Sequence, residues 1–290
     1  RARMVYVCMP ISLANLLSQV PESLYPEELV IDEAHHTAAD TWETIRAFFK
    51  NPPCLGLTAT PRRTDGIALT MYDSILQTIT VKEAVEFGFL ARPLVIVPEE
   101  WQKKLDIPNE DIDTRQGLEK QAAALGETMI IGDVIRSYGE VFHGLPVLVA
   151  CSTFGHAKAM SAAFTAAGWK FEHIHSGLPT AERKRMLRMI RSGELHGLCT
   201  VGIGIEGMDI PGLYGLIWLR RTMSVTIYLQ FIGRVLRPMP GKVFGVILDP
   251  VGNLFIHGFP DAERHWTLDG EAPERTESKC PTMKICPRCG

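Results

Sequence analysis

The sequence predicts an α/β protein of two domains, each a mostly parallel sheet covered by helices on both faces. Short apolar stretches of strand length alternate with segments of helical periodicity along the chain, which is typical of parallel sheets with crossover helices. A length of 290 residues is enough for about two domains. Residues 99–127 are rich in Glu, Asp, Lys and Gln and contain no strand-like apolar run, so they separate two similar halves.

We expect a first domain over 1–98, a connector over 99–128, a second domain over 129–250 and a C-terminal extension over 251–290. The first domain is predicted to contain strands over 4–8, 29–31, 54–61 and 94–97 and helices over 13–20, 38–50 and 81–89. The second is predicted to contain strands over 147–151, 171–174, 198–201, 216–219 and 243–248, and helices over 129–142, 155–167, 179–192 and 224–236. Ser12 and Ser224 are plausible helix N-caps.

Composition places the protein among ordinary soluble globular proteins, with 46% hydrophobic and 22% charged residues. The sequence contains no apolar run of transmembrane length and no signal-peptide pattern, so we expect a cytoplasmic protein with no membrane partner. A net charge of −3 excludes an overall basic field, although a local cleft could still be basic. Four cysteines lie singly in apolar stretches and indicate buried thiols in a reducing compartment: Cys8, Cys54, Cys151 and Cys199.

Two adjacent carboxylates, Asp32 and Glu33, follow the apolar run over 29–31. In an open α/β sheet, ligands bind beyond the carboxyl ends of the strands. One carboxylate could hold Mg²⁺, which prefers hard oxygen ligands, and the other could activate a water that attacks phosphorus. The alternative is a strand that ends in two solvated acids.

Two arginines in the second half form another candidate site. Arg234 and Arg237 are three residues apart, so on a helix they share a face, and Gln230 lies one turn earlier. Two guanidinium groups on one face suit a phosphate chain. The alternative is a pair of surface arginines that stabilise a helix C-terminus. A loop with glycines at 202, 204 and 207 follows the strand over 198–201 and lets backbone approach a ligand.

Four motifs in order make this sequence similar to a known family. They are Asp32-Glu33-Ala34-His35, Thr58-Ala59-Thr60, Glu206-Gly207-x-Asp209-x-Pro211 and Gln230-x-x-Gly233-Arg234-x-x-Arg237-Pro238. Over residues 4–270 the chain resembles superfamily-two helicases of the DEAD/DEAH-box type, in the style of the type III restriction motor subunit and phage-type helicases. The resemblance implies two RecA-like domains, with ATP in the cleft between them and nucleic acid across both.

The resemblance also implies cofactors and residue roles. ATP and Mg²⁺ are the expected cofactors, with Asp32 on the metal and Glu33 activating water. His35, Thr58 and Thr60 are expected to couple the nucleotide site to movement. From the second domain, Gly207 and Asp209 approach the nucleotide, Gln230 senses the γ-phosphate, and Arg234 and Arg237 act as arginine fingers.

Nucleic acid is the implied partner, with DNA favoured over RNA and protein partners unspecified. Backbone-reading contacts are expected at strand ends and on the first domain. The candidate positions are Pro10, Ser12, Ser152, Thr153, Ser176, Gly177 and Thr200. Locally satisfied turn hydroxyls are the alternative at each position. The competing functions are a catalytically inactive nucleic-acid-binding fragment and an RNA helicase.

The sequence departs from the family in two places. No Gly-Lys-Ser/Thr phosphate loop precedes Asp32, so we expect an N-terminal truncation and little ATP binding or hydrolysis by these 290 residues alone. Ile205 stands where relatives often carry a hydroxyl, which puts one nucleic-acid contact in doubt. The tail also carries Cys280, Cys286 and Cys289, a spacing that suggests half of a Zn²⁺ knuckle completed elsewhere.

Overall fold

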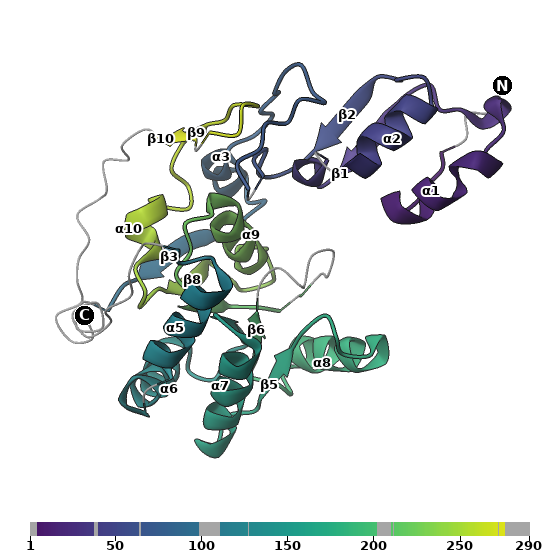
Figure 1. The fold of residues 1–290 in the computed structure, drawn as a ribbon. Coiled ribbons are helices and arrows are strands. Elements are labelled where there is room, and N and C mark those ends of the chain that lie inside the picture. The colour runs from purple at the N-terminus through teal and green to yellow at the C-terminus, as the bar shows by residue number, and fades with distance from the viewer. Residues whose placement is uncertain are drawn as a thin grey trace. The chain divides into compact units, whose positions relative to one another are not determined.

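The computed structural model describes residues 5–37, 40–63, 65–98, 111–126, 128–201, 210, 212–271 and 273–275. The chain forms two compact units. Unit 1 comprises Arg1–Gln77 and Arg264–Glu274, and unit 2 comprises Thr78–Glu263 and Arg275–Gly290. Figure 1 shows the elements of each unit. No helix within the described ranges is both long and apolar enough to cross a bilayer.

Unit 1 contains a two-stranded parallel sheet in which Leu29 pairs with Cys54 and Asp32 with Leu57. Leu17, Ile45 and Phe49 form a small core, against which Leu13 and Trp42 also pack. The elements are α1 (Pro10–Leu16), η1 (Leu17–Gln19), η2 (Glu22–Leu24), β1 (Leu29–Asp32), η3 (Ala34–His36), α2 (Asp40–Phe48) and β2 (Cys54–Leu57).

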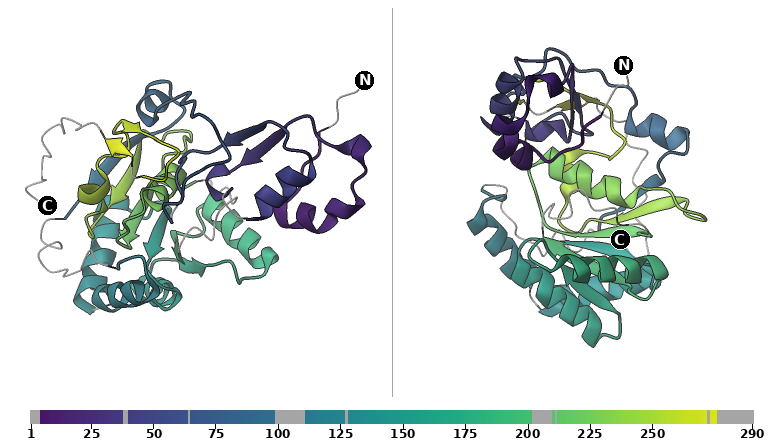
Figure 2. Two further views of the ribbon diagram at one scale, coloured as in Figure 1. Left: turned by 45° about the horizontal axis from the view of Figure 1, so that its top comes forward. Right: turned by 90° about the vertical axis from the view of Figure 1, so that its right-hand side faces the viewer.

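Unit 2 is built on a six-stranded sheet in the order β3-β8-β7-β4-β6-β5, in which every neighbouring pair is parallel. The central strand β4 is buried at all five positions because helices cover both faces. Helices α6 and α7 lie on one face and α9 on the other, as the views in Figures 1 and 2 agree. The strands are β3 (Arg92–Ile96), β4 (Val147–Cys151), β5 (Phe171–Ile174), β6 (Gly197–Val201), β7 (Gly215–Leu219) and β8 (Phe244–Leu248).

The helices of unit 2 follow the predicted alternation closely. Thr80 and Glu83 form a reciprocal capping box at the start of α3, and Ser224 caps α9 as predicted. The helices are α3 (Val81–Glu86), α5 (Arg115–Leu125), α6 (Thr128–Phe142), α7 (Phe154–Ala166), α8 (Thr180–Ser192), α9 (Val225–Val235) and α10 (Asn253–His257). Two short strands, β9 (Arg264–His265) and β10 (Glu274–Arg275), pair with each other.

The fold class is confirmed: the protein is mixed α/β, with parallel sheets flanked by helices. Some local predictions are wrong. Residues 5–8 have no regular structure, although a strand was expected over 4–8. The first helix starts at Pro10 rather than after Ser12, because a proline at the first helical position needs no N–H partner.

The division between the units lies earlier in the chain than the predicted connector. Strand β3 pairs with β8, and Val95 and Ile96 pack against the core of unit 2. Residues 78–98 therefore group with unit 2 by contact, although the sequence assigned them to the first domain. Strand β3 joins that sheet by long-range pairing with residues 244–248, which local sequence pattern does not reveal.

Candidate functional site

The acidic pair lies where the chain turns sharply at the end of β1. Asp32 closes the strand, and Glu33 adopts the left-handed conformation with φ 49° and ψ 49°. A non-glycine residue in this region is uncommon, and such residues gather at functional sites. The Glu33 N–H donates to Asp32 Oδ1 at 2.9 Å, and both side chains are exposed. The turn thus leaves both carboxylates accessible at the carboxyl end of the strand.

A chain of polar contacts, hydrogen-bonded from His35 onward, joins the acidic turn to the end of β2. His35 Nδ1 lies 2.9 Å from Thr58 Oγ1 and 3.4 Å from Glu33 Oε2. Thr58 Oγ1 donates to the Thr60 carbonyl at 3.1 Å and accepts the Thr60 N–H at 3.1 Å. Because the hydroxyl has one hydrogen and gives it to Thr60, the proton between His35 and Thr58 belongs to Nδ1. We call the path Glu33–His35–Thr58–Thr60 the coupling chain.

His35 is uncharged at neutral pH. Its side chain is 2% exposed. Burial, with a smaller contribution from neighbouring His36, lowers the pKa of His35 to about 4. The contact between His35 and Glu33 is therefore that of a neutral N–H with a carboxylate, so it links the two residues without neutralising the Glu33 charge.

Asp32 fits a magnesium ion that keeps most of its water. Magnesium in nucleotide sites is usually held by one or two carboxylates together with phosphates and waters. Asp32 is an exposed carboxylate at a strand end. Among the residues that the structure describes, no three His, Cys, Asp or Glu side chains gather into a metal cage. This donor set suits a hydrated Mg²⁺ brought by a phosphate ligand.

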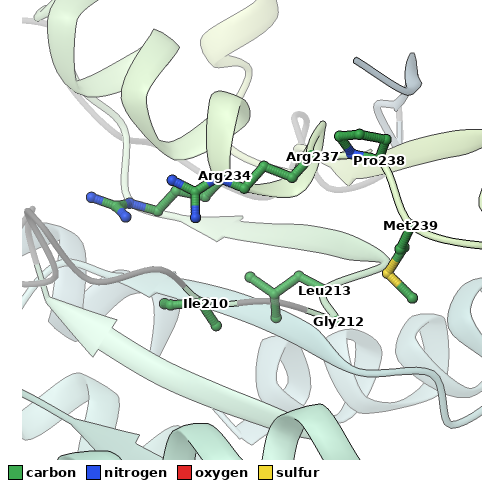
Figure 3. A pocket seen from close by; sticks show the side chains of 7 residues that line it. All are labelled: Ile210, Gly212, Leu213, Arg234, Arg237, Pro238 and Met239. Carbon is green, nitrogen blue, oxygen red and sulfur yellow. The ribbon is translucent and has the colours of Figure 1, made fainter. Parts of the chain in front are cut away.

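The two arginines of unit 2 line one pocket of about 300 Å³. Figure 3 shows their side chains above Ile210 and Leu213. Helix α9 ends at Val235, so Arg234 is its penultimate residue and Arg237 lies in the segment beyond it. The prediction that both arginines share a helix face is therefore wrong, but both still reach the same space. The lining residues are Ile210, Gly212, Leu213, Arg234, Arg237, Pro238 and Met239.

Gln230 is half-buried on α9, one turn before Arg234, and is not among the residues that line this pocket. Gly207 and Asp209 fall outside the described residues, so their predicted roles stay predictions. The same holds for the tail cysteines Cys280, Cys286 and Cys289, and nothing in the described part of the chain supports a zinc site.

Two predicted nucleic-acid contacts have inward-facing hydroxyls. Ser152 is 1% exposed, and its Oγ donates to the Leu219 carbonyl at 3.1 Å and lies 3.3 Å from Gln121 Oε1. Thr200 is fully buried. Strands β4 and β6 end at the predicted residues, but each has a neighbouring strand on both sides, and these two hydroxyls are enclosed by the protein. Neither hydroxyl is presented to a ligand in this structure.

The other predicted contacts lie nearer the surface. Thr153 Oγ1 caps α7 by accepting the His156 N–H at 3.1 Å. Ser12 on α1 is exposed and Pro10 is half-buried. Ser176 and Gly177 are exposed, and the Gly177 N–H donates to the neighbouring His175 Nδ1 at 3.2 Å. These positions remain able to meet a backbone, although two of their groups already have protein partners.

Sequence reasoning missed a polar network around the segment that directly precedes α9. Asp113 accepts hydrogen bonds from Thr222 Oγ1 at 3.0 Å and from the Met223 N–H at 2.7 Å. Gln121 is 2% exposed and binds the Ile112 carbonyl at 2.9 Å and the Arg221 N–H at 2.8 Å. Both Asp113 and Gln121 lie in the segment assigned to the connector. The polar composition that suggested a connector also supplied these buried hydrogen bonds, and no local signal separates the two.

Two family models match the chain. Residues 3–63 match the type III restriction enzyme, res subunit, and residues 131–239 match the helicase conserved C-terminal domain. The first match includes the acidic turn and the coupling chain, and the second includes both arginines.

Curated relatives extend over most of the chain. A 51.5 kDa protein of a Lactococcus phage (isolate 7-9) is 29% identical over 91% of this chain and 58% of its own length. Putative helicase 22 of a Sulfolobus islandicus filamentous virus is 28% identical, over 79% and 43%. Putative ATP-dependent helicase IRC3 of Saccharomyces cerevisiae is 26% identical, over 77% and 34%. The chain thus spans from about a third to somewhat over half of these relatives.

Solved structures share the fold. The ATP-dependent Type ISP restriction-modification enzyme LlaBIII bound to DNA matches with a TM-score of 0.53 and 18% identity, over 81% of this chain and 19% of the other. S. cerevisiae Dbp5 bound to RNA and ADP BeF3 matches with a TM-score of 0.53 and 17% identity, over 86% and 60%. At these identities, the match supports the fold class alone.

Proposed function

Because this chain is a superfamily-two helicase-like protein, we propose that the protein is an ATP-driven nucleic-acid motor, a helicase or translocase that acts on DNA. ATP hydrolysis would require groups from both units. Glu33 in unit 1 would supply the base, and Arg234 and Arg237 in unit 2 would supply positive charge to the phosphates.

The coupling chain is the observation that carries this proposal. For hydrolysis to drive movement, the carboxylate that acts as general base needs a physical link to another structural element. Here Nδ1 of the neutral His35 contacts both the Glu33 carboxylate and the Thr58 hydroxyl, and that hydroxyl is hydrogen-bonded to the Thr60 backbone. A change in the charge or position of Glu33, such as a bound triphosphate would cause, alters hydrogen bonds at the end of β2. This is how hydrolysis could move a neighbouring segment.

The unit 2 residues would complete the site. Arg234 and Arg237 point into one pocket, and two guanidinium groups at a phosphate chain stabilise charge that develops in phosphoryl transfer. Gln230 would sense the γ-phosphate, and Gly207 and Asp209 would approach the nucleotide from the same unit. Magnesium, held by Asp32, would neutralise phosphate charge when it is bound.

The nucleic-acid track would be contacted through its backbone. Exposed Ser12, Ser176 and Gly177, together with Pro10 and Thr153, would contact phosphates without reading sequence. DNA is proposed rather than RNA, because residues 3–63 match a type III restriction enzyme subunit and one solved structure with the same fold is a restriction-modification enzyme bound to DNA. The match to an RNA-bound helicase keeps RNA as the alternative for the test.

The test is steady-state ATP hydrolysis by the whole protein with single-stranded DNA, duplex DNA or RNA. We expect DNA to stimulate turnover and Glu33→Gln to abolish it, because the amide cannot accept the water's proton. Stimulation by RNA but not by DNA would mean that the motor acts on RNA. Unchanged turnover by Glu33→Gln would remove Glu33 as the base and refute the proposal for this site.

A further inference from the structure

A tight turn after α9 brings a lysine back to the end of that helix. The Lys242 N–H donates to the Met239 carbonyl at 3.0 Å, and Gly241 has φ 78°. Proline at the second position and a left-handed glycine at the third are the requirements of a type II β-turn. Strand β8 then passes close to α9, because a Cβ on Gly245 would lie 2.6 Å from the Val235 carbonyl oxygen. The turn therefore places Lys242 against the last turn of the helix.

The Lys242 ammonium binds three backbone carbonyls from two segments. Its Nζ donates to the Leu213 carbonyl at 2.6 Å, to the Arg237 carbonyl at 3.2 Å and to the Val235 carbonyl. The last carbonyls of a helix have no partner within it, and a cation at that end also favours the helix dipole. Leu213 belongs to the opposite wall of the arginine pocket. One ammonium thus ties the two walls together.

The side chain is specialised for this contact. Lys242 is half-buried, and burial lowers its pKa to about 8. Its hydrogen-bond partners are neutral backbone carbonyls, of which the Val235 carbonyl belongs to the last residue of α9. An uncharged side chain of similar length would leave all three carbonyls without this donor.

We propose that Lys242 is a positioning residue, whose ammonium fixes the position of Arg234 and Arg237 relative to the pocket wall formed by Ile210, Gly212 and Leu213. Arg234 directly precedes one of the bound carbonyls, and Arg237 carries another. Fixing these backbone points limits how far either guanidinium can move. The inference rests on the proposed function, in which these arginines meet the triphosphate, and a misplacement of about 1 Å can cost about 10²-fold in rate.

The test compares three variants in the whole protein. Lys242→Met keeps the aliphatic stem and removes the donors, and Lys242→Arg keeps a charged donor. Lys120→Met is the matched control, because Lys120 is exposed on α5. We expect Lys242→Met to lower DNA-stimulated kcat by about 10- to 100-fold. The KM for ATP should change by less than about threefold, because the proposed role is to stabilise charge in the transition state rather than to bind ATP in the ground state. Lys242→Arg should recover most of kcat.

Folding is checked separately from positioning. All variants are assayed well below their melting temperatures, and Lys242→Gln replaces Lys242→Met if the latter does not fold. Amide hydrogen exchange over 236–241, measured at the residues other than proline, should speed up at least about tenfold in the variant that lacks the ammonium. It should stay unchanged in Lys120→Met, because only the Lys242 variant releases the helix end.

The outcomes distinguish the two proposals. If Arg237→Ala abolishes turnover but Lys242→Met keeps kcat within threefold of the parent, the positioning role is refuted and the proposed function stands. If the parent does not hydrolyse ATP, the proposed function fails, and hydrogen exchange alone then decides whether Lys242 fixes the arginine segment. Unchanged exchange over 236–241 would refute the positioning role in either case.

Discussion

Replacing Thr58 by valine removes the central hydroxyl of the coupling chain while keeping the shape of the side chain. The hydroxyl accepts from His35 Nδ1 at 2.9 Å, donates to the Thr60 carbonyl at 3.1 Å and accepts the Thr60 N–H at 3.1 Å. In the variant, His35 Nδ1 loses its contact with the Thr58 hydroxyl, while Glu33 Oε2 lies farther away, at 3.4 Å. The change therefore isolates the hydrogen bonds from packing.

The expected cost follows from burial. His35 and Thr60 are 2% and 1% exposed, so water cannot replace the lost partner. Removing one partner of a buried hydrogen bond costs about 1–3 kcal/mol. We expect the β1–β2 pair to open more easily by about 2 kcal/mol, which corresponds to about 30-fold faster amide exchange.

Native-state hydrogen exchange at the amides of β1 and β2 measures this effect locally, which matters because two units need not unfold together. Thr58→Ser retains the hydroxyl and should keep exchange close to that of the parent. Thr70→Val is the matched control, because Thr70 is exposed in unit 1. Exchange in Thr58→Val within threefold of the parent would refute the coupling chain as a stabilising link.

Three further predictions concern stability. Gly245→Ala should destabilise the protein by about 1–3 kcal/mol in calorimetry, because its Cβ would lie 2.6 Å from the Val235 carbonyl oxygen. The Cβ of Gly233→Ala on α9 would meet nothing within 4 Å, so that variant should be more stable than the parent by up to about 1 kcal/mol. A Gly245→Ala variant more stable than Gly233→Ala would contradict this packing. Burial raises the pKa of Asp249 to about 6, so between about pH 4 and 6 the folded protein binds a proton that the unfolded chain does not. The stability of the parent therefore falls as pH rises through this range, and the stability of Asp249→Asn relative to the parent should rise by up to about 3 kcal/mol between pH 4 and 7 in denaturant titrations. A stability difference that does not change with pH would be inconsistent with this burial. The lowered pKa of His35 has the opposite effect on stability. Between about pH 6.5 and 4 only the unfolded chain binds the proton, so the stability of unit 1 should fall as pH falls through this range. Amide exchange in β1, corrected for intrinsic rates, should report this loss of stability in the parent and none in His35→Gln.

Local pattern was enough to predict most strands and helices of unit 2. The all-apolar run over 147–151 is β4, and Ser224 caps α9, since continuous apolar runs and capping hydroxyls are local signals. Sheet order was not readable. The pairing of β3 with β8 joins residues about 150 positions apart, and it depends on tertiary packing.

The candidate site was predictable in composition but not in geometry. The motif at Asp32 and Glu33 indicated carboxylates at a strand end, which the structure shows. The left-handed backbone at Glu33, which turns its side chain toward His35, has no signature in residue type. The sequence predicts Ser152 as a strand-end hydroxyl that contacts nucleic acid, yet it is buried against Gln121, a residue from a segment whose polar composition suggests only a connector.

The most direct test of the account is a double-mutant cycle on DNA-stimulated ATP hydrolysis by the whole protein, with Glu33→Gln, Arg237→Ala and the double variant. If both groups act on one triphosphate, each single change removes most of the turnover, and the double variant is no slower than the slower single variant. Rate losses that multiply in the double variant would mean that Glu33 and Arg237 act independently, and they would contradict a shared site.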